Sequence, residues 1–322
     1  MSALDDEFAA ILDGRASLEE TKAFLTRSVA LMHDAEALAA GARAMRARMT
    51  RLAAPAGAID VCGTGGDGAH TLNISTAVAF VVAGAGVAVA KHGNRAMSSK
   101  SGAADVLEAL GVKLTGDVPT LERCLREAGV AFLFAQNHHP AMRHVAPARK
   151  ELGFRTIFNL LGPLTNPAGV TRQLLGVFAA DCAEPMAQAL RLLGAEKAWV
   201  LHGAGGLDEL VQANGNIVFS ASQRGVERVM LDFLGEHGGP DAAALRGGDA
   251  QHNAQALRAL LAGASQNESY RGAVELNAGA ALVVAGVAGD LGEGMMLARD
   301  SLDEGLALAA LDRLIALTKD AP

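Results

Sequence analysis

The sequence predicts an α/β protein with two parts: a small, discontinuous helical domain at the N-terminus and a larger α/β domain whose mainly parallel central sheet is flanked by helices. Three observations support this prediction. Apolar side chains in residues 4–50 recur at helical spacing. From Ile59 onward, short apolar runs alternate with Gly-containing turns and helical segments. A further helical segment, at 138–163, then interrupts that alternation.

The N-terminal segment is expected to form three helices. Ser17 and Glu20 have the S-x-x-E spacing of a capping box, which opens the second helix. Ala35–Met49 is rich in Ala, Leu and Arg and has almost no β-branched residues, so it predicts the third. Leu52–Gly57 (LAAPAG) is expected to be a linker. The first helix is indicated by four apolar residues at helical spacing: Leu4, Phe8, Ile11 and Leu12.

Five apolar runs predict the strands of the sheet, and each leads into a polar loop. They are Ile59–Cys62, Val87–Ala90, Val130–Ala135, Leu174–Phe178 and Trp199–His202. Helices are expected to begin near Ser75 and to span Ser101–Leu110. Because ligands of parallel α/β sheets bind beyond the carboxyl ends of the strands, the polar loops are the expected binding region.

The helical segment at 138–163 is interpreted as a return to the N-terminal helical domain, ended by the two prolines of NLLGPLTNP. The predicted division is therefore 1–54, completed by 138–163, for the helical domain, and 58–137 with 168–322 for the α/β domain. Two amphipathic helices are expected in Ala278–Leu317, around Gly286–Gly294.

Composition excludes several classes of protein. Hydrophobic residues make up 50% of the chain, which is inconsistent with a disordered protein. Lys and Arg number 28 and Asp and Glu 35, so the formal charge is −7 and binding to nucleic acid through net charge is disfavoured. A local basic site for an anionic small molecule remains open.

The sequence also predicts a cytoplasmic location. Its first residues, MSALDDEFAAILDGR, lack the basic flank and apolar run of a signal peptide. The longest uncharged apolar stretch, Ala77–Ala90, is shorter than the ~20 residues that a membrane-spanning helix needs. The three cysteines have neither CxxC spacing nor an even number, so a disulfide framework is not expected: Cys62, Cys124 and Cys182.

The first motif is the glycine-rich string DVCGTGGDG, followed by TLNIST. Its glycines allow close backbone approach to a ligand, and its amides and the following helix start favour phosphate. The alternative is an ordinary glycine turn with Ser/Thr capping, which the length of the string disfavours. The string lacks both the GxxxxGK[ST] and the G-x-G-x-x-G spacing, so it does not predict the common nucleotide-binding loops.

Two further motifs follow other strands. KHGNRAMSSKSG places three cations within ten residues, at Lys91, Arg95 and Lys100, which suits phosphate better than a merely solvated loop does. GGLDEL contains the adjacent carboxylates Asp208 and Glu209. Such a pair alone is more often found at a helix start, but beside two phosphate loops it suits Mg²⁺. Together the motifs predict a ligand with two phosphate groups.

At this point the sequence resembles the anthranilate phosphoribosyltransferase family of tryptophan biosynthesis. The resemblance runs from about Asp60 to Leu317. It rests on the motifs DVCGTGGDG, TLNIST, KHGNRAMSSKSG, ADVLEALG, HHPAMRHVAPARKELGFRTIFNLLGPLTNP, HGAGGLDEL and NAGAALVVAG. It implies a helical domain hinged to an α/β domain, usually as a homodimer. It also implies transfer of the phosphoribosyl group from 5-phosphoribosyl 1-diphosphate to the amine of anthranilate, assisted by two Mg²⁺ ions.

The family pattern further implies a set of binding residues. Phosphoribosyl diphosphate would be held by Gly63, Gly66, Asp67, Thr71, Asn73, Ile74, Ser75, Thr76, Lys91, His92, Gly93, Asn94, Arg95, Ala96, Met97, Ser98, Ser99 and Ala103. Anthranilate would contact Gly63, Asn94 and Arg149, with His92 and His139 lining its approach. The metal ions would be held by Ser75, Asp208 and Glu209. A guanidinium at Arg149 suits the carboxylate of the aromatic acid. No residue is expected to act as a general base, because an aryl amine is already neutral near pH 7.

The chain departs from the family pattern in three places. The segment between Phe24 and Met45 is short, which concerns the helices that commonly build the dimer. Gly205 stands where an acidic residue is common, and Ala103 stands where a small hydroxyl residue is frequent. Met142, in addition, lies at a position that varies within the family. None of these lies in a motif core.

Two alternative functions are distinguishable. A pyrimidine-nucleoside phosphorylase of the same structural group would need no metal at Asp208 and Glu209, so magnesium dependence distinguishes it from the predicted enzyme. A transferase of the same group that acts on another aromatic amine is distinguished by the acceptor that it uses. A non-enzymatic, nucleic-acid-binding relative should carry a basic face and degraded motifs, which this acidic chain does not have.

Overall fold

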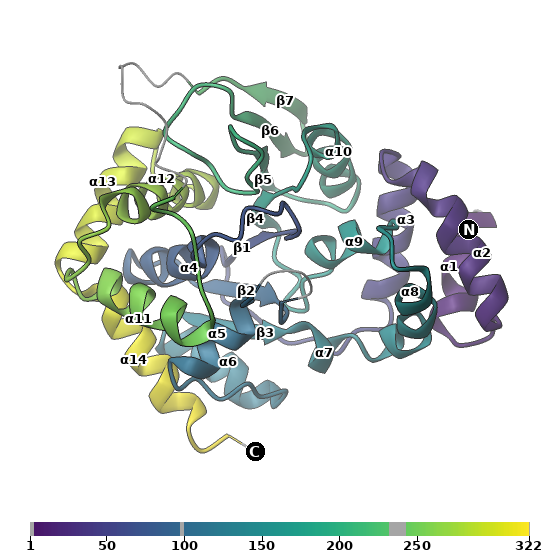
Figure 1. The fold of residues 1–322 in the computed structure, drawn as a ribbon, viewed down its shortest axis with the longest axis horizontal. Helices are drawn as coiled ribbons and strands as arrows, with labels where there is room; N and C mark the ends of the chain where they lie inside the picture. The colour runs from purple at the N-terminus through teal and green to yellow at the C-terminus, as the bar shows by residue number, and fades with distance from the viewer. Residues whose placement is uncertain (1–2, 97–99, 232–242, 322) are drawn as a thin grey trace.

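A seven-stranded sheet runs through the centre of the computed structural model, which describes residues 3–96, 100–231 and 243–321 (Figure 1). Its order is β3-β2-β1-β4-β5-β6-β7. The strands are β1 (Ile59–Gly63), β2 (Val89–Gly93), β3 (Val130–Phe134), β4 (Arg172–Gly176), β5 (Lys197–His202), β6 (Ile217–Ser222) and β7 (Gly225–Val229). The first five pair in parallel, as the apolar runs predict. The antiparallel hairpin β6–β7, which the sequence analysis did not predict, extends the edge.

One face of the sheet is covered by helices from the middle and the C-terminus of the chain. These are α4 (Ile74–Gly84), α5 (Ala103–Ala109), α6 (Val118–Glu127), α11 (Ala250–Leu261), α12 (Glu268–Ala285), α13 (Leu291–Asp303) and α14 (Leu306–Thr318). They share one hydrophobic core with inward residues of the sheet such as Val61 and Leu174. α4 contributes to this core along almost its whole length, since all of its residues except Ser75 and Gly84 are buried.

The other face carries a second core, built with the N-terminal helices. Its elements are α1 (Ala3–Leu12), α2 (Leu18–Arg27), η1 (Ser28–Leu31), α3 (Ala35–Arg46), α7 (Ala135–His138), η2 (Pro140–His144), α8 (Ala146–Leu152), α9 (Phe158–Leu161), η3 (Gly162–Leu164), η4 (Ala180–Cys182) and α10 (Ala183–Leu192). Strand alternation divides the sheet between the two cores, since Cys62 and Leu175 belong to this second one. In Figure 1, α1–α3 lie at the right beside α8, away from α11–α14.

The N-terminal helices form as the local sequence predicts. Ser17 caps α2 in a complete capping box with Glu20. Asp34 caps α3 through the backbone amides of Glu36 and Ala37. Phe8 packs edge-on against Phe24 of α2 and Phe158 of α9, with ring centroids 5.0 and 5.9 Å apart. Residues 138–164 therefore pack against the N-terminal helices, although they follow β3 in the chain.

Several element boundaries differ from the prediction. For example, β5 begins at Lys197, two residues before its predicted run, and α3 ends at Arg46 and not at Met49. β2 begins two residues later than expected, so Lys91, His92 and Gly93 lie in the strand and not after it. β4 lies two residues earlier than its apolar run. The prediction of two helices in Ala278–Leu317 is wrong: three helices, α12 to α14, occupy it, because the left-handed residue Gly305 (φ 71°) separates α13 from α14.

Two findings bear on the general class of the protein. The three cysteines are buried and free, as their spacing predicts. Among the described residues, no helix is both long and apolar enough to span a bilayer.

Candidate functional site

A cavity of about 750 Å³ opens at the carboxyl ends of the parallel strands. Its walls come from the loop after β1, the end of β2 and the loop after it, the helical segment around α8, and the turn that contains Asp208 and Glu209. β1 lies between β2 and β4 in the sheet, so the first two polar motifs are direct neighbours. The expectation that the motifs meet at this edge of the sheet is confirmed.

The glycine-rich loop forms the floor of the cavity. Gly65, Gly66 and Gly68 have φ values of 64°, 80° and 82°, a region that side chains other than glycine rarely adopt. Thr64 ties the loop to β4, because its backbone amide donates to Gly176 O (2.9 Å) and its hydroxyl accepts from Phe178 N (2.9 Å). The loop is thus held in a conformation that exposes backbone to the cavity.

Polar residues at the start of α4 divide between cavity and interior. Ser75 lines the cavity, whereas the side chain of Thr76 is buried. Asn73 also lines the cavity, but its side-chain oxygen accepts a hydrogen bond from Asn253 Nδ2 (2.9 Å). Ser75 is therefore the hydroxyl at this helix start that lines the cavity.

Lys91 is a buried cation beneath the cavity. Only 3% of the residue is exposed, and Nζ donates to Val61 O (2.8 Å) and to Ser75 Oγ (3.2 Å). Burial lowers its pKa, which the neighbouring carboxylate of Asp60 partly opposes. Asp60 is fully buried, and burial raises its pKa to about 6. Lys91 thus places positive charge between β1 and Ser75.

His92 and His139 form a buried imidazole pair. Their Nε2 atoms lie 3.1 Å apart, and His92 Nδ1 lies 3.1 Å from Gly162 O. Burial lowers the pKa of both rings, that of His139 to about 4, so both are neutral near pH 7. His92 lines the cavity, and His139 stands behind it.

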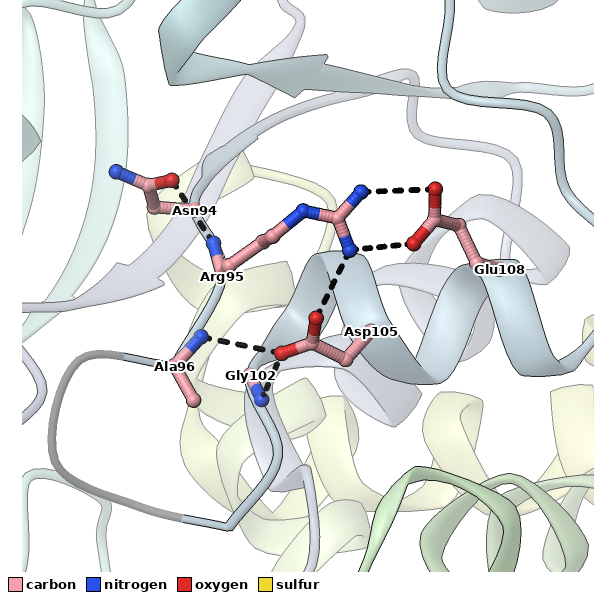
Figure 2. A network of polar contacts seen from close by, with 6 residues as sticks. All are labelled: Asn94, Arg95, Ala96, Gly102, Asp105 and Glu108. Atoms are coloured by element: carbon pink, nitrogen blue, oxygen red, sulfur yellow. Dashed lines mark hydrogen bonds and ion pairs between the residues drawn. The ribbon is translucent and has the colours of Figure 1, made fainter.

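Arg95 lies at the cavity rim, but its guanidinium is engaged by α5 (Figure 2). It pairs with both carboxylate oxygens of Glu108 and with Asp105 Oδ1 (2.9 Å). Asp105 Oδ2 also accepts from the backbone amides of Ala96 (3.1 Å) and Gly102 (2.8 Å). Asp105 therefore ties together the two ends of the segment 96–102, a role that the sequence analysis missed.

Three carboxylates, one from the glycine-rich loop and two from the turn after β5, meet at one side of the cavity. Asp67, Asp208 and Glu209 each place an oxygen within 4.8 Å of the others. Asp208 Oδ2 accepts from Gly65 N (2.9 Å), and Glu209 Oε2 is buried without a hydrogen-bond partner. Burial raises the pKa of both Asp208 and Glu209; repulsion from Asp67 adds to the shift of Asp208, and repulsion from Asp208 and Asp67 adds to that of Glu209. A buried, unpartnered oxygen among three carboxylates is the environment that a hard divalent cation such as Mg²⁺ satisfies.

Three glycines make room for the turn that carries these carboxylates. An added Cβ would lie 2.4 Å from Asp208 Oδ2 at Gly63, 1.6 Å from Asp208 O at Gly176 and 1.9 Å from Glu209 O at Gly203. At Gly176 and Gly203 the neighbouring atoms are backbone, so the turn packs directly on the main chain of β4 and of the residue after β5. At Gly63 the neighbour is the carboxylate of Asp208, which a side chain at that position would displace.

The helical segment supplies the remaining wall, with Arg149, Phe154 and Asn159. Arg149 is half-buried, and burial lowers its pKa; in the described part of the chain it takes part in none of the ion pairs. The guanidinium of Arg155 stacks on Phe178, 4.2 Å from the ring centroid, and bonds Gly66 O. Arg155, Asn159 and Phe178 were not predicted individually, although the quoted GFRTIFN string contains the first two.

Most of the predicted binding residues line this one cavity. They are Gly63, Gly66, Asp67, Thr71, Asn73, Ser75, Lys91, His92, Gly93, Asn94, Arg95, Ala96, Ala103, Arg149, Asp208 and Glu209. Ile74, Thr76 and His139 are buried next to lining residues and do not line it. Met97, Ser98 and Ser99 lie outside the described residues.

The chain is similar in sequence to proteins of known family. Residues 56–308 match the family model described as "Glycosyl transferase family, a/b domain". The chain is 54% identical to the anthranilate phosphoribosyltransferase of Phenylobacterium zucineum over 322 aligned residues, which cover 98% of this chain and 93% of the relative.

Solved structures of the same kind of enzyme are similar to this structure. The structure is similar to that of anthranilate phosphoribosyltransferase from Thermus thermophilus, with a TM-score of 0.91, 43% identity, and coverage of 98% of this chain and 94% of that one. It is also similar to the Saccharomyces cerevisiae enzyme in complex with PRPP (5-phosphoribosyl 1-diphosphate) and Mg, with a TM-score of 0.87, 28% identity, and coverage of 98% and 92%.

Proposed function

Because the chain belongs to the anthranilate phosphoribosyltransferase family, we propose that its cavity binds both substrates and two Mg²⁺ ions of that reaction. The protein transfers the phosphoribosyl group of 5-phosphoribosyl 1-diphosphate to the amine of anthranilate, in tryptophan biosynthesis. The observation that carries the assignment of the site is a single cavity in which two phosphate-type loops meet the Asp208–Glu209 pair, with Asp67 of the first loop completing a group of three carboxylates.

The phosphoribosyl donor lies across β1 and β2 in this proposal. The backbone of Gly63–Gly68 and the start of α4 bind one phosphate group, because free amides and the helix dipole favour anions. Residues 91–99 with Ala103 enclose the other side of the donor. Lys91 acts from below through its fixed charge, since its Nζ is already bonded to Val61 O and Ser75 Oγ. Arg95 shapes the loop and does not itself offer a free guanidinium.

Asp67, Asp208, Glu209 and the Ser75 hydroxyl are the residues that would hold magnesium. Bound there, the ions stabilise negative charge that develops on the leaving diphosphate. Magnesium use agrees with the Mg-bound yeast relative, and the proposal of two ions rests on the family resemblance. Asp208 couples this group to the donor loop through Gly65 N.

Anthranilate enters from the α8 side. The half-buried guanidinium of Arg149 pairs with its carboxylate, and Asn94, Gly63 and the neutral His92 ring, backed by His139, line its approach. As the bond from ribose C1 to diphosphate breaks, its electron pair leaves with diphosphate. The amine lone pair then forms the new bond to C1, and the nitrogen loses its proton. Catalysis consists mainly of positioning and electrostatic stabilisation, and we assign no general base.

We further infer the domain division, assembly and location predicted from the sequence. Residues 1–54 with 138–163 form the helical domain, supported by the packing of Phe8 on Phe158, and 58–137 with 168–322 form the α/β domain. Closure of one on the other excludes water that would hydrolyse the donor. The proposed assembly is a homodimer and the proposed location is the cytoplasm.

A direct assay tests this function. Anthranilate fluorescence is expected to decay when protein, donor and Mg²⁺ are combined, and to persist when EDTA is added. Turnover with another aromatic amine but not with anthranilate would overturn the acceptor assignment. Full activity in EDTA would overturn the assignment of magnesium to this site. Phosphorolysis of a pyrimidine nucleoside without Mg²⁺ would instead favour the phosphorylase alternative. Light scattering in solution separately tests the dimer, for which a monomer mass is the contrary result.

A further inference from the structure

Asn277 is a buried asparagine in the middle of α12, and its amide is bonded to the chain next to Glu209. Only 3% of the residue is exposed. Its Oδ1 accepts from Leu210 N (2.9 Å), and its Nδ2 donates to Leu210 O (2.9 Å) and to Ala273 O (2.8 Å). The two bonds to Leu210 fix the orientation of the amide, because the backbone N–H requires an acceptor and the backbone C=O a donor.

Such a residue is unfavourable in a helix interior unless its polar atoms have a use. Asparagine has lower helix propensity than alanine, and a buried amide without partners costs free energy. Asn277 is surrounded in α12 by apolar residues, from Leu276 and Ala278 to Leu282. Its hydrogen bonds hold both the N–H and the C=O of a single residue on a different segment.

That residue directly follows the metal-binding pair. Leu210 is fully buried and comes immediately after Glu209. A small cavity of about 20 Å³ lies beside this contact between α12 and the turn. Its lining includes Ser75, Asp208, Glu209 and Asn277. The Asp208–Glu209 turn is thus gripped on its C-terminal side by Asn277, while Gly203 N bonds Leu207 O (2.7 Å) on its N-terminal side.

We propose that Asn277 is a positioning residue for the magnesium site, which holds the Asp208–Glu209 turn in its binding geometry by clasping both backbone groups of Leu210. Both of its N–H groups are bonded to backbone carbonyls, so its role is to orient the carboxylates and not to replace them. This inference rests on the proposed metal site. Partners that orient metal ligands typically affect metal affinity by about 10–100-fold when they are removed.

The test is a titration of Mn²⁺, in the presence of inorganic diphosphate, followed by the electron paramagnetic resonance signal of free Mn²⁺. Asn277→Ala is expected to weaken Mn²⁺ binding about tenfold or more. Asn277→Asp, which keeps the shape and one acceptor but loses both donors, is expected to weaken it as well. Circular dichroism establishes that each variant is folded.

Asn267→Ala is the matched control, since Asn267 lies at the start of the same helix and also bonds backbone, at Tyr270 N and Ala244 O. It is expected to lower thermal stability while leaving Mn²⁺ affinity within about twofold. The KM for anthranilate in Asn277→Ala should change far less than the Mn²⁺ affinity.

The possible failures are distinguishable. If Asp208→Asn with Glu209→Gln leaves Mn²⁺ binding intact, the proposed metal site is wrong. If that double variant abolishes binding while folded Asn277→Ala and Asn277→Asp bind Mn²⁺ as the wild type does, the inference on Asn277 is wrong. Equal weakening in Asn267→Ala and Asn277→Ala would reduce Asn277 to a stabilising residue of α12 and also overturn the inference.

Discussion

The carboxylate of Asp208 accepts a 2.9 Å hydrogen bond from the backbone amide of Gly65, which lies 143 residues earlier in the chain. This bond joins the two sides of the proposed donor site before any ligand is present. It places the carboxylate group against the backbone that is expected to bind phosphate. A negative charge at that position is useful only when a cation lies between it and the phosphate.

Neutralising the carboxylate pair is therefore expected to remove the response to magnesium. Asp208→Asn with Glu209→Gln should lower kcat/KM at saturating Mg²⁺ by about a hundredfold or more, since a metal ion supplies several kcal/mol of charge stabilisation. Steady-state rates over a Mg²⁺ series measure the effect. The exposed pair Asp303 and Glu304, changed in the same way, serves as control and should behave as wild type. A magnesium response that survives would place the ions elsewhere.

Arg149 is expected to determine affinity for the acceptor. Arg149→Ala should raise the KM for anthranilate about 10–100-fold, because a hydrogen-bonded charge pair contributes about 1.5–3 kcal/mol. The KM for the phosphoribosyl donor should change little. Arg149→Lys keeps the charge but loses the bidentate geometry, so an intermediate KM is expected. Equal effects on both substrates would contradict the role of Arg149 in acceptor binding.

Asp105 is expected to matter for the donor although it does not face the cavity. Asp105→Asn replaces an acceptor of three hydrogen bonds, from Arg95, Ala96 and Gly102, with a group that has one acceptor oxygen. The KM for the donor should rise about tenfold, which corresponds to about 1.4 kcal/mol. Glu108→Gln, which alters the same network at its exposed end, should leave the donor KM within about twofold. If the two variants change the donor KM equally, the link that Asp105 makes between residues 96 and 102 does not determine donor binding.

The raised pKa of Asp60 predicts a contribution to folding stability that decreases as pH rises. Burial raises its folded pKa from 3.8 to about 6, so between these values the unfolded chain loses a proton that the folded chain retains. The stabilisation is fully present below pH 4 and is lost as pH passes 6, by about 3 kcal/mol at most. His139, whose pKa is lowered to about 4, acts in the opposite direction over part of this range.

The Asp60 component is isolated by comparison with Asp60→Asn, which keeps the shape of the side chain. Urea unfolding at a series of pH values should show the wild type losing stability relative to Asp60→Asn as pH increases from 4 to 7. A difference between the two proteins that is independent of pH would mean that Asp60 titrates normally.

The sequence was sufficient to predict the parallel sheet and the position of the site. The five parallel strands are buried on both faces, so they appear as continuous apolar runs, and the topology then brings their polar loops to one edge. The β6–β7 hairpin was missed because its residues are only partly buried and include Ser220 and Glu227. The third C-terminal helix was missed because the break at Gly305 interrupts an otherwise helical pattern.

Individual roles within the site were harder to predict. The run Lys91, Arg95 and Lys100 indicates positive charge, but it does not say which carboxylates the cations meet. Arg95 pairs with α5, whereas Lys91 is buried under Ser75. Asp105 and Asn277 lie within the quoted strings ADVLEALG and NAGAALVVAG, but the strings do not say what these side chains bond, and only the packing of α5 and α12 shows what they hold.

The direct packing of the Asp208–Glu209 turn on glycine backbone limits how this catalyst can be altered. A redesign for other aromatic amines has freedom at the outer wall, where 46% of Phe154 is exposed. Gly63, Gly176 and Gly203 offer no such latitude, since even alanine would collide there with the turn. Mutant libraries that vary the acceptor side while holding those three positions constant are the ones that should retain the reaction.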